Sequence, residues 1–296
     1  MSVKPIFEGA ATALVTPLDE NGVNYEQLGR LIDWQIESGI DALVICGTTG
    51  ESSTLGDQEH VEVLRYSYER AAGRVPMIAG TGSNDTAYAI WLTREAAKIG
   101  YEAALVVTPY YNKTTQRGLV ANFTAIADNC NIPLILYNVP SRTGVNIEPA
   151  TYAILAEHPN IVAIKEAGGN LSKIVETMAL VGDKLAVYSG NDDQIVPIIA
   201  CGGKGVISVL SDLLPGETSR MCHLALEGNL AEAMALQEKY LPLINALFCE
   251  VNPIPVKAAM AHMGFCKNYL RLPLIPMEED HEKMLVERMK EVGIHV

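Results

Sequence analysis

Residues 161–168 read Ile-Val-Ala-Ile-Lys-Glu-Ala-Gly, a short run of apolar and β-branched side chains that ends in a lysine. Such a run, bounded by glycine, is typical of a strand that is buried on both faces of a parallel sheet. Lys165 therefore stands at the carboxyl end of a predicted strand. Lysine is seldom fully buried, and burial lowers its pKa because the ammonium loses its hydration.

Two interpretations of Lys165 follow from this segment. In the first, the amine is neutral and can attack a carbonyl to form a Schiff base. In the second, the methylene stem is buried and the charged head reaches water. The segment alone does not choose between them.

Seven other apolar runs share the length and composition of this one. Helical patterns lie between them, and the clearest runs from Asn24 to Gly39, where Leu28, Leu31 and Ile32 share one face. The predicted strands cover residues 9–15, 41–46, 76–80, 103–108, 133–137, 161–165, 185–189 and 205–209. The predicted helices between them cover residues 24–39, 85–99, 116–129, 148–157, 171–181 and 192–200.

Eight alternations of strand and helix predict an α/β protein with a (β/α)8 TIM barrel. A doubly wound sheet is the alternative, although it usually has fewer strands. The strand signal stops near Gly216, and helices are predicted over residues 221–227, 230–248, 255–263 and 278–292. We therefore expect a catalytic barrel over residues 1–220 and a C-terminal helical domain over residues 221–296.

The composition excludes several classes of function. Of the 296 residues, 49% are hydrophobic and 19% are charged, which indicates a globular protein with a large core. The net charge of -13 argues against binding to nucleic acid or to an anionic membrane surface. The six histidines lack the spacing of metal ligands, so we expect no bound metal.

The cysteines, the first residues and the length of the apolar runs indicate the cellular compartment. The six cysteines form no Cys-x-x-Cys pair, which predicts free thiols in a reducing cytoplasm. The first residues, Met1 to Pro5, contain no apolar signal core, and no run reaches the roughly 18 apolar residues of a membrane-spanning helix. We therefore expect a cytoplasmic protein.

Polar and reactive residues follow the predicted strands. In an α/β barrel the chemistry takes place at the carboxyl ends of the strands, so these residues should meet at one mouth. The candidates are Thr48, Thr49, Tyr110, Tyr111, Tyr137, Arg142, Lys165, Gly190 and Ile207.

This set has a chemical logic. Hydroxyls and backbone amides can hold the carboxylate of a keto acid, and a Tyr–Thr–Tyr chain can move protons to and from an enamine. Arg142 can bind a second carboxylate through two parallel hydrogen bonds. Each residue also has a structural interpretation: residues 48–50 as a polar turn, Tyr110 and Tyr111 as surface packing, and Arg142 as a solvated charge. Strand alternation points Glu166 away from Lys165, so we do not expect it to be a catalytic partner.

Four motifs together resemble the dihydrodipicolinate synthase / N-acetylneuraminate lyase family of pyruvate-dependent class I aldolases. They are Ala13-Leu14-Val15-Thr16-Pro17, Gly47-Thr48-Thr49-Gly50-Glu51, Tyr137-Asn138-Val139-Pro140 and Ile164-Lys165-Glu166. The resemblance covers essentially the whole chain. It is specific because Thr49, Tyr137 and Lys165 come from three separate loops that must match together.

The resemblance implies a role for each candidate. Lys165 forms an imine with pyruvate, and Tyr137 donates and accepts protons beside it. Thr48 links Tyr137 to Tyr111, which in this family comes from a neighbouring subunit. Thr49 binds the pyruvate carboxylate together with backbone groups.

The resemblance also implies the remaining contacts and partners. Gly190 and Ile207 match positions that line the pyruvate site. The pair Thr48-Thr49 and Arg142 favour the lyases whose second substrate is L-aspartate 4-semialdehyde, in the diaminopimelate route to lysine. No separate cofactor is required because the lysine imine is the electron sink. The family implies a homo-oligomer, a tetramer built as a dimer of dimers.

Two rival functions stay open at this point. The first is a 2-keto-3-deoxy sugar-acid aldolase, or another pyruvate-dependent lyase, on the same scaffold. The second is a barrel without catalysis that binds a keto acid as a sensor. The presence of Lys165, Tyr137, Thr48 and Tyr111 together argues against the second.

Regulation by lysine depends on a different set of residues. Lysine-inhibited members of the family have a feedback site at a subunit interface, and the matching positions here are Ser52, His60, Asn84 and Tyr110. The acidic residue that meets the ammonium of the effector in many of those enzymes is replaced by Tyr88. Asp57 stands where another histidine is common.

We predict weak or absent inhibition by L-lysine. A lost charge-assisted bond of roughly 1.5–3 kcal/mol weakens binding about ten- to a hundredfold. A cation–π contact with Tyr88 returns on the order of 0.5–2 kcal/mol. Titration of lysine into the condensation assay at subsaturating pyruvate measures the effect. Strong inhibition by submillimolar lysine would show that another acidic group, such as Glu51 or Asp57, meets the ammonium.

Overall fold

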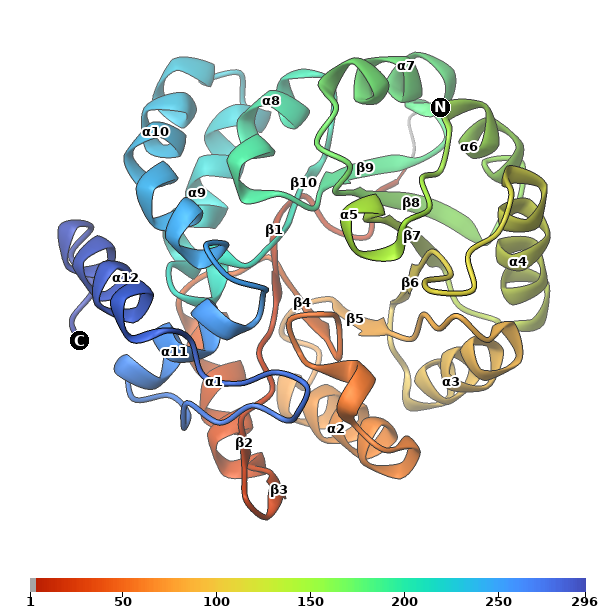
Figure 1. Ribbon diagram of the computed structural model, residues 1–296. Coiled ribbons are helices and arrows are strands. Elements are labelled where there is room, and N and C mark those ends of the chain that lie inside the picture. The colour runs from red at the N-terminus through yellow and green to blue at the C-terminus, as the bar shows by residue number, and fades with distance from the viewer. Residues whose placement is uncertain (1–3) are drawn as a thin grey trace.

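The computed structural model describes residues 4–296, and residues 1–3 of the predicted barrel domain lie outside the described residues. Eight parallel strands close into a barrel in the order β1-β10-β9-β8-β7-β6-β5-β4, with helices around it (Figure 1). The predicted TIM barrel is confirmed, and the closed sheet excludes the doubly wound alternative. The strands are β1 (Gly9–Ala13), β4 (Ala42–Ile45), β5 (Met77–Gly80), β6 (Ala103–Val107), β7 (Leu134–Asn138), β8 (Ile161–Glu166), β9 (Ala186–Ser189) and β10 (Gly205–Ser208).

The eight predicted strands match the observed strands to within two residues at each end. The small hairpin of β2 (Leu18–Asp19) and β3 (Gly22–Val23) was not predicted, because two residues are too few to show alternation. The helices are α1 (Tyr25–Glu37), α2 (Asp57–Ala71), α3 (Thr86–Ile99), α4 (Gln116–Asn129), α5 (Pro140–Thr143), α6 (Pro149–Leu155), α7 (Leu171–Val181), α8 (Ile195–Ala200), α9 (Pro215–Leu226), α10 (Leu230–Leu247), α11 (Ile254–His262) and α12 (Glu279–Glu291).

Three helices differ from the sequence-based expectation, and one of them is α5, a single turn that was not predicted. Helix α2 was missed because its buried stripe is thin and includes the polar residues His60 and Ser67. Helix α9 starts at Pro215, where proline suits the first turn, and not at residue 221. The predicted division between residues 220 and 221 therefore falls inside α9, which packs against β1.

The inside of the barrel is filled mainly by small side chains. Six of the inward-facing residues are alanines from β1, β4, β6, β8 and β9, namely Ala11, Ala13, Ala42, Ala103, Ala163 and Ala186. Near the amino ends of the strands, the rings of Phe7 and Tyr188 stack with centroids 4.3 Å apart. The Tyr188 hydroxyl donates to the carbonyl oxygen of Phe7 at 2.8 Å. This aromatic plug is part of the apolar cluster inside the barrel, and Tyr188 pairs with Lys165 in the register of β8 and β9.

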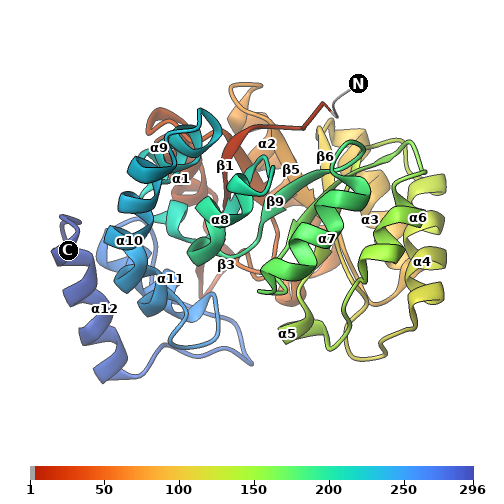
Figure 2. The same cartoon turned by 90° about the horizontal axis from the view of Figure 1, so that it is seen from above.

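The C-terminal helices α10, α11 and α12 lie beside one flank of the barrel (Figure 2). A buried ion pair joins them to the loop after β4: Lys257 Nζ lies 2.5 Å from Glu51 Oε1, with both side chains at most 1% exposed. Lys257 also donates to the carbonyl oxygen of Thr16 at 2.7 Å. Within residues 4–296, no helix is both long and apolar enough to cross a lipid bilayer.

Candidate active site

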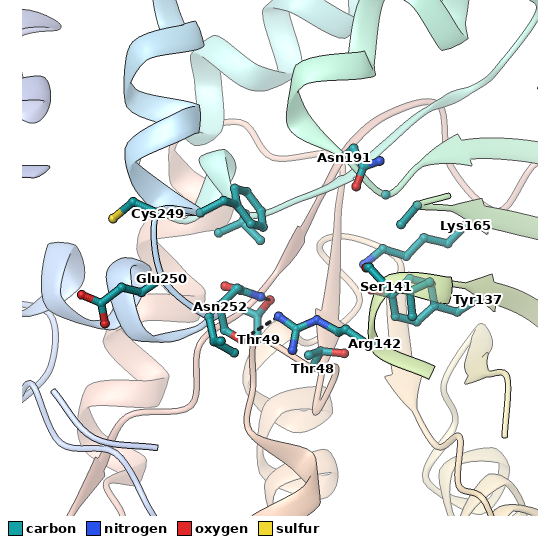
Figure 3. Close-up of a pocket in the computed structure, with 16 residues that line it drawn as sticks. Thr48, Thr49, Tyr137, Ser141, Arg142, Lys165, Asn191, Cys249, Glu250 and Asn252 are labelled. Carbon is teal, nitrogen blue, oxygen red and sulfur yellow. Dashed lines mark hydrogen bonds between the residues drawn. The ribbon is translucent and has the colours of Figure 1, made fainter. Parts of the chain in front are cut away.

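A cavity of about 490 Å³ lies at the carboxyl ends of the strands (Figure 3). Its wall joins strand ends that are far apart in sequence to the segment between α10 and α11. The lining residues are Thr48, Thr49, Tyr137, Val139, Ser141, Arg142, Lys165, Ala167, Gly190, Asn191, Val209, Phe248, Cys249, Glu250, Val251 and Asn252. Six of the eight predicted catalytic and substrate-binding residues are among them, namely Thr48, Thr49, Tyr137, Arg142, Lys165 and Gly190, whereas Tyr111 and Ile207 are not.

Lys165 projects from the end of β8 into this cavity, with its side chain only 6% exposed. Its Nζ lies over the ring of Tyr137, 4.4 Å from the centroid. The pKa of Lys165 is lowered to about 7, because burial and the nearby Arg142 charge disfavour the ammonium while the Asp192 carboxylate partly opposes them. A large share of the amine is therefore neutral near pH 7, which is the form that attacks a carbonyl.

Tyr137 stands on β7 directly opposite Lys165 in the strand pairing. Burial raises the pKa of its phenol, while the Arg142 charge and a hydrogen bond with Thr48 lower it. The phenol therefore stays protonated at neutral pH and can donate a proton to a group formed on Lys165. Thr48 lines both this cavity and a second one of about 490 Å³.

Gly190 leaves room for the lysine stem. A Cβ atom placed on Gly190 would lie 3.2 Å from Lys165 Cε and 2.8 Å from the Cβ of Ala167. The Gly190 N–H donates to the carbonyl oxygen of Glu166 at 2.7 Å, which brings the end of β9 close to β8. A side chain at residue 190 would therefore displace Lys165.

Asn252 joins Thr49 to Arg142. Its Nδ2 donates to Thr49 Oγ1 at 3.0 Å, and its backbone oxygen accepts from Arg142 Nη2 at 2.8 Å. Figure 3 shows Arg142 between this pair and the side chains of Lys165 and Tyr137. Arg142 therefore presents its guanidinium inside the cavity, where it can bind a carboxylate.

Asp192 is a buried carboxylate behind the lysine. Its Oδ2 accepts from the N–H groups of Val209 and Leu210 at 3.0 and 2.8 Å. Burial raises its pKa, and the Lys165 charge and these hydrogen bonds lower it. Asp192 therefore opposes the loss of charge on Lys165 without lining the main cavity.

Two predicted residues do not line the cavity. Ile207 is buried in the apolar cluster inside the barrel, with Tyr137 and Tyr188, and its contact with pyruvate stays a prediction. Tyr111 is 92% exposed, and its φ is 70°. Positive φ is rare for a bulky residue and is typical of functional positions.

The predicted regulatory residues are divided between two hollows. Ser52, His60 and Tyr110 line a cavity of about 490 Å³, and Asn84 lines a separate one. In the first, the Tyr88 hydroxyl donates to Asp57 Oδ1 at 3.0 Å. His60 Nε2 lies 3.0 Å from the Gly80 carbonyl oxygen, and burial lowers the pKa of His60 to about 4, so the ring is neutral. Both departures noted in the sequence, Tyr88 and Asp57, therefore face the same space.

The sequence reasoning missed the contribution of the C-terminal segment. Residues 248–252 close one side of the cavity, yet they follow a helix that looked remote from the barrel. No local motif marks Asn252, because its role depends on contacts with residues more than 100 positions away. Among the described residues, no group of three or more His, Cys, Asp or Glu could hold a metal.

Comparison with known proteins agrees with this geometry. Residues 6–292 match the Dihydrodipicolinate synthetase family. The 4-hydroxy-tetrahydrodipicolinate synthase of Lachnoclostridium phytofermentans is 54% identical over 98% of this chain and 99% of its own length. That of Acetivibrio thermocellus is 52% identical, with the same coverage of both chains. The crystal structure of dihydrodipicolinate synthase from Aquifex aeolicus superposes with a TM-score of 0.96 at 44% identity, over 98% of this chain and 99% of that one.

We predict that pyruvate is trapped on Lys165 with a rate that depends on pH. Because the pKa of Lys165 is about 7, the rate of reductive trapping with cyanoborohydride should rise between pH 5.5 and 8.5 with a midpoint near 7. Mass spectrometry of the digested protein locates the adduct. Lys165→Ala should lose the adduct and nearly all activity, whereas Lys267→Ala on the surface should change neither. An adduct on another lysine, or a midpoint above pH 9, would contradict the assignment.

Proposed function

This chain belongs to the dihydrodipicolinate synthetase family, and we propose that it joins pyruvate to L-aspartate 4-semialdehyde through an imine on Lys165. Its activity is that of the 4-hydroxy-tetrahydrodipicolinate synthases, the lyases of the diaminopimelate route to lysine. The observation that carries the mechanism is the buried amine of Lys165 over the Tyr137 ring, at the floor of a cavity that also contains Thr49 and Arg142.

The first half of the reaction activates pyruvate. The neutral Lys165 amine attacks the keto carbon, and water leaves to give an imine. Thr49 and the neighbouring backbone groups bind the carboxylate, which holds the methyl group toward the open side of the cavity. A methyl proton then passes through Tyr137 and Thr48, and the electron pair of the broken C–H bond forms an enamine.

The second half forms the carbon–carbon bond. The enamine carbon attacks the aldehyde carbon of the second substrate, and the aldehyde oxygen takes a proton from the Tyr137 relay. Arg142 binds the carboxylate of that substrate and orients it. The amino group of the substrate then attacks the imine carbon, closes the ring and releases Lys165 as the free amine.

The other properties follow from the same assignment. No separate cofactor takes part, since the imine itself accepts the electron pair. The relay through Tyr111 requires a partner subunit, so the active form is a homo-oligomer, built as a tetramer of two dimers. The six free cysteines fit a reducing cytoplasm.

A second function, cleavage of 2-keto-3-deoxy sugar acids, is favoured by one observation. A hollow of about 400 Å³ adjoins the main cavity and shares Ser141 and Asn191 with it. Its wall includes Asp193 and Gln194, whose polar groups suit the hydroxyls of a longer chain. The two functions differ in whether Arg142 binds the carboxylate of L-aspartate 4-semialdehyde.

We predict that Arg142→Ala raises the KM for L-aspartate 4-semialdehyde about ten- to a hundredfold, because a charge-assisted bond of roughly 1.5–3 kcal/mol is lost. The KM for pyruvate should change much less. Arg142→Lys keeps the charge but loses the planar guanidinium that forms two parallel hydrogen bonds. Its KM for L-aspartate 4-semialdehyde should therefore lie between those of the wild type and of Arg142→Ala. Steady-state kinetics with each substrate varied in turn measure the effect. Equal changes for both substrates, together with efficient cleavage of 2-keto-3-deoxygluconate, would favour the sugar-acid aldolase.

We predict that Tyr111→Phe lowers kcat about tenfold or more while the oligomer stays intact, because the ring remains and the proton-carrying hydroxyl is lost. Sedimentation velocity and the condensation assay measure the two properties on the same sample. Tyr240→Phe, which removes a hydroxyl far from the cavity, is the matched control and should keep the wild-type kcat. A monomer with full activity would refute a site that is shared between subunits.

A further inference from the structure

The two residues that meet at the imine stand opposite each other across two strands. In the pairing of β7 with β8, Tyr137 lies opposite Lys165, and the next pair is Asn138 opposite Glu166. Side chains alternate between the two faces of a strand, so the first pair points into the barrel and the second toward the helices. The chemistry therefore depends on the register of this one strand pair.

That register is irregular just upstream. Leu134 pairs with Ile161, but Ile135 pairs with Ala163, so Val162 is passed over. A shift of one residue turns every side chain of a strand to the opposite face. The pairing of the residues before the irregularity therefore does not by itself fix the pairing of those after it, which include Tyr137 and Lys165.

Side chains lock the pairing above the irregularity. Asn138 Nδ2 donates to Glu166 Oε1 and Oε2 at 2.9 and 3.1 Å. The Tyr152 hydroxyl donates to Oε2 at 3.1 Å, and the N–H of Gly168 donates to Oε1 at 2.6 Å. Asn138 is fully enclosed, and burial raises the pKa of Glu166. The carboxylate is thus held by three donors in a place where unpaired polar groups are costly.

The same asparagine reaches the segment that carries the guanidinium. Asn138 Oδ1 accepts from the N–H of Ile147 at 3.1 Å, and its Nδ2 also donates to Asn146 Oδ1 at 2.8 Å. These residues follow α5, which contains Arg142. The interaction therefore joins the ends of β7 and β8 to the loop that follows α5.

From this arrangement we infer that Asn138 and Glu166 form a polar clasp, outside the barrel, that holds Tyr137 and Lys165 in the register required for proton transfer at the imine. Both are positioning residues, since neither lines the cavity. A pairing shifted by one residue would turn the Lys165 amine toward the apolar helix layer and separate Glu166 from its three donors. The clasp makes that alternative pairing unfavourable.

The inference rests on the proposed function and has its own test. Glu166→Gln replaces an acceptor oxygen by an NH2 group that faces donors, and Asn138→Asp places two carboxylates against each other. Because misplacement of a reacting group by about 1 Å costs on the order of a hundredfold in rate, each change should lower kcat about ten- to a hundredfold. The KM for pyruvate should change less than about threefold, because the carboxylate site at Thr49 is untouched.

The double variant Asn138→Asp/Glu166→Gln provides the decisive comparison. This double variant again places a carboxylate opposite an amide, now with the carboxylate at position 138 and the amide at position 166. Its kcat should therefore be at least about tenfold higher than that of the less active single variant. Additive losses in the double variant would overturn the inference, since a merely structural contribution at each position predicts them. Unchanged kcat in both single variants would overturn it as well. Glu157→Gln, at a surface carboxylate after α6, is the control and should match the wild type.

Two further measurements keep the outcomes distinct. If a single variant does not fold, Tyr152→Phe removes one donor from the clasp and leaves both strands intact, and it should lower kcat about two- to fivefold with an unchanged KM for pyruvate. A wild-type kcat in Tyr152→Phe would then overturn the inference. Trapping of pyruvate on wild-type Lys165 is measured first, because its absence refutes the imine mechanism itself and not the clasp.

Discussion

The dehydration of one amine sets the conditions for the rest of this site. Lys165 loses its solvation because the end of β8 lies inside a closed ring of eight strands, and the groups around it are arranged to tolerate a neutral nitrogen. Gly190 leaves space for the stem, and Asp192 limits how far the pKa falls. The balance between burial and one nearby carboxylate keeps the amine reactive near neutrality and still able to take up a proton.

The helices beyond the barrel contribute to this balance from outside. The buried pair of Glu51 and Lys257 fixes the loop that carries Thr48 and Thr49 to helix α11. Removing one partner of such a pair leaves an uncompensated buried charge, which costs about 3–5 kcal/mol. Asn252 adds a direct link to Thr49. The C-terminal segment is therefore part of the site and not an appendage to it.

The sequence predicted the strands and most of the candidate residues that line the cavity, because these depend on local patterns. Eight apolar runs mark the strands, and Lys165, Tyr137 and Thr49 stand at or just after three of them. Helix α2 was not predicted because polar residues occupy part of its buried face. The position of Asn252, the second cavity beside Thr48 and the clasp behind β7 and β8 arise from contacts between distant segments, which no local pattern contains.

The aromatic plug of Phe7 and Tyr188 has a consequence for how substrates enter and leave the cavity. These two rings belong to the apolar cluster inside the barrel, whereas the cavity is lined by residues at the carboxyl ends of the strands and by residues 248–252. Under the mechanism proposed above, pyruvate bonded to Lys165 lies at the inner end of this cavity, so we expect the aldehyde to bind after it and the product to leave before the next pyruvate enters.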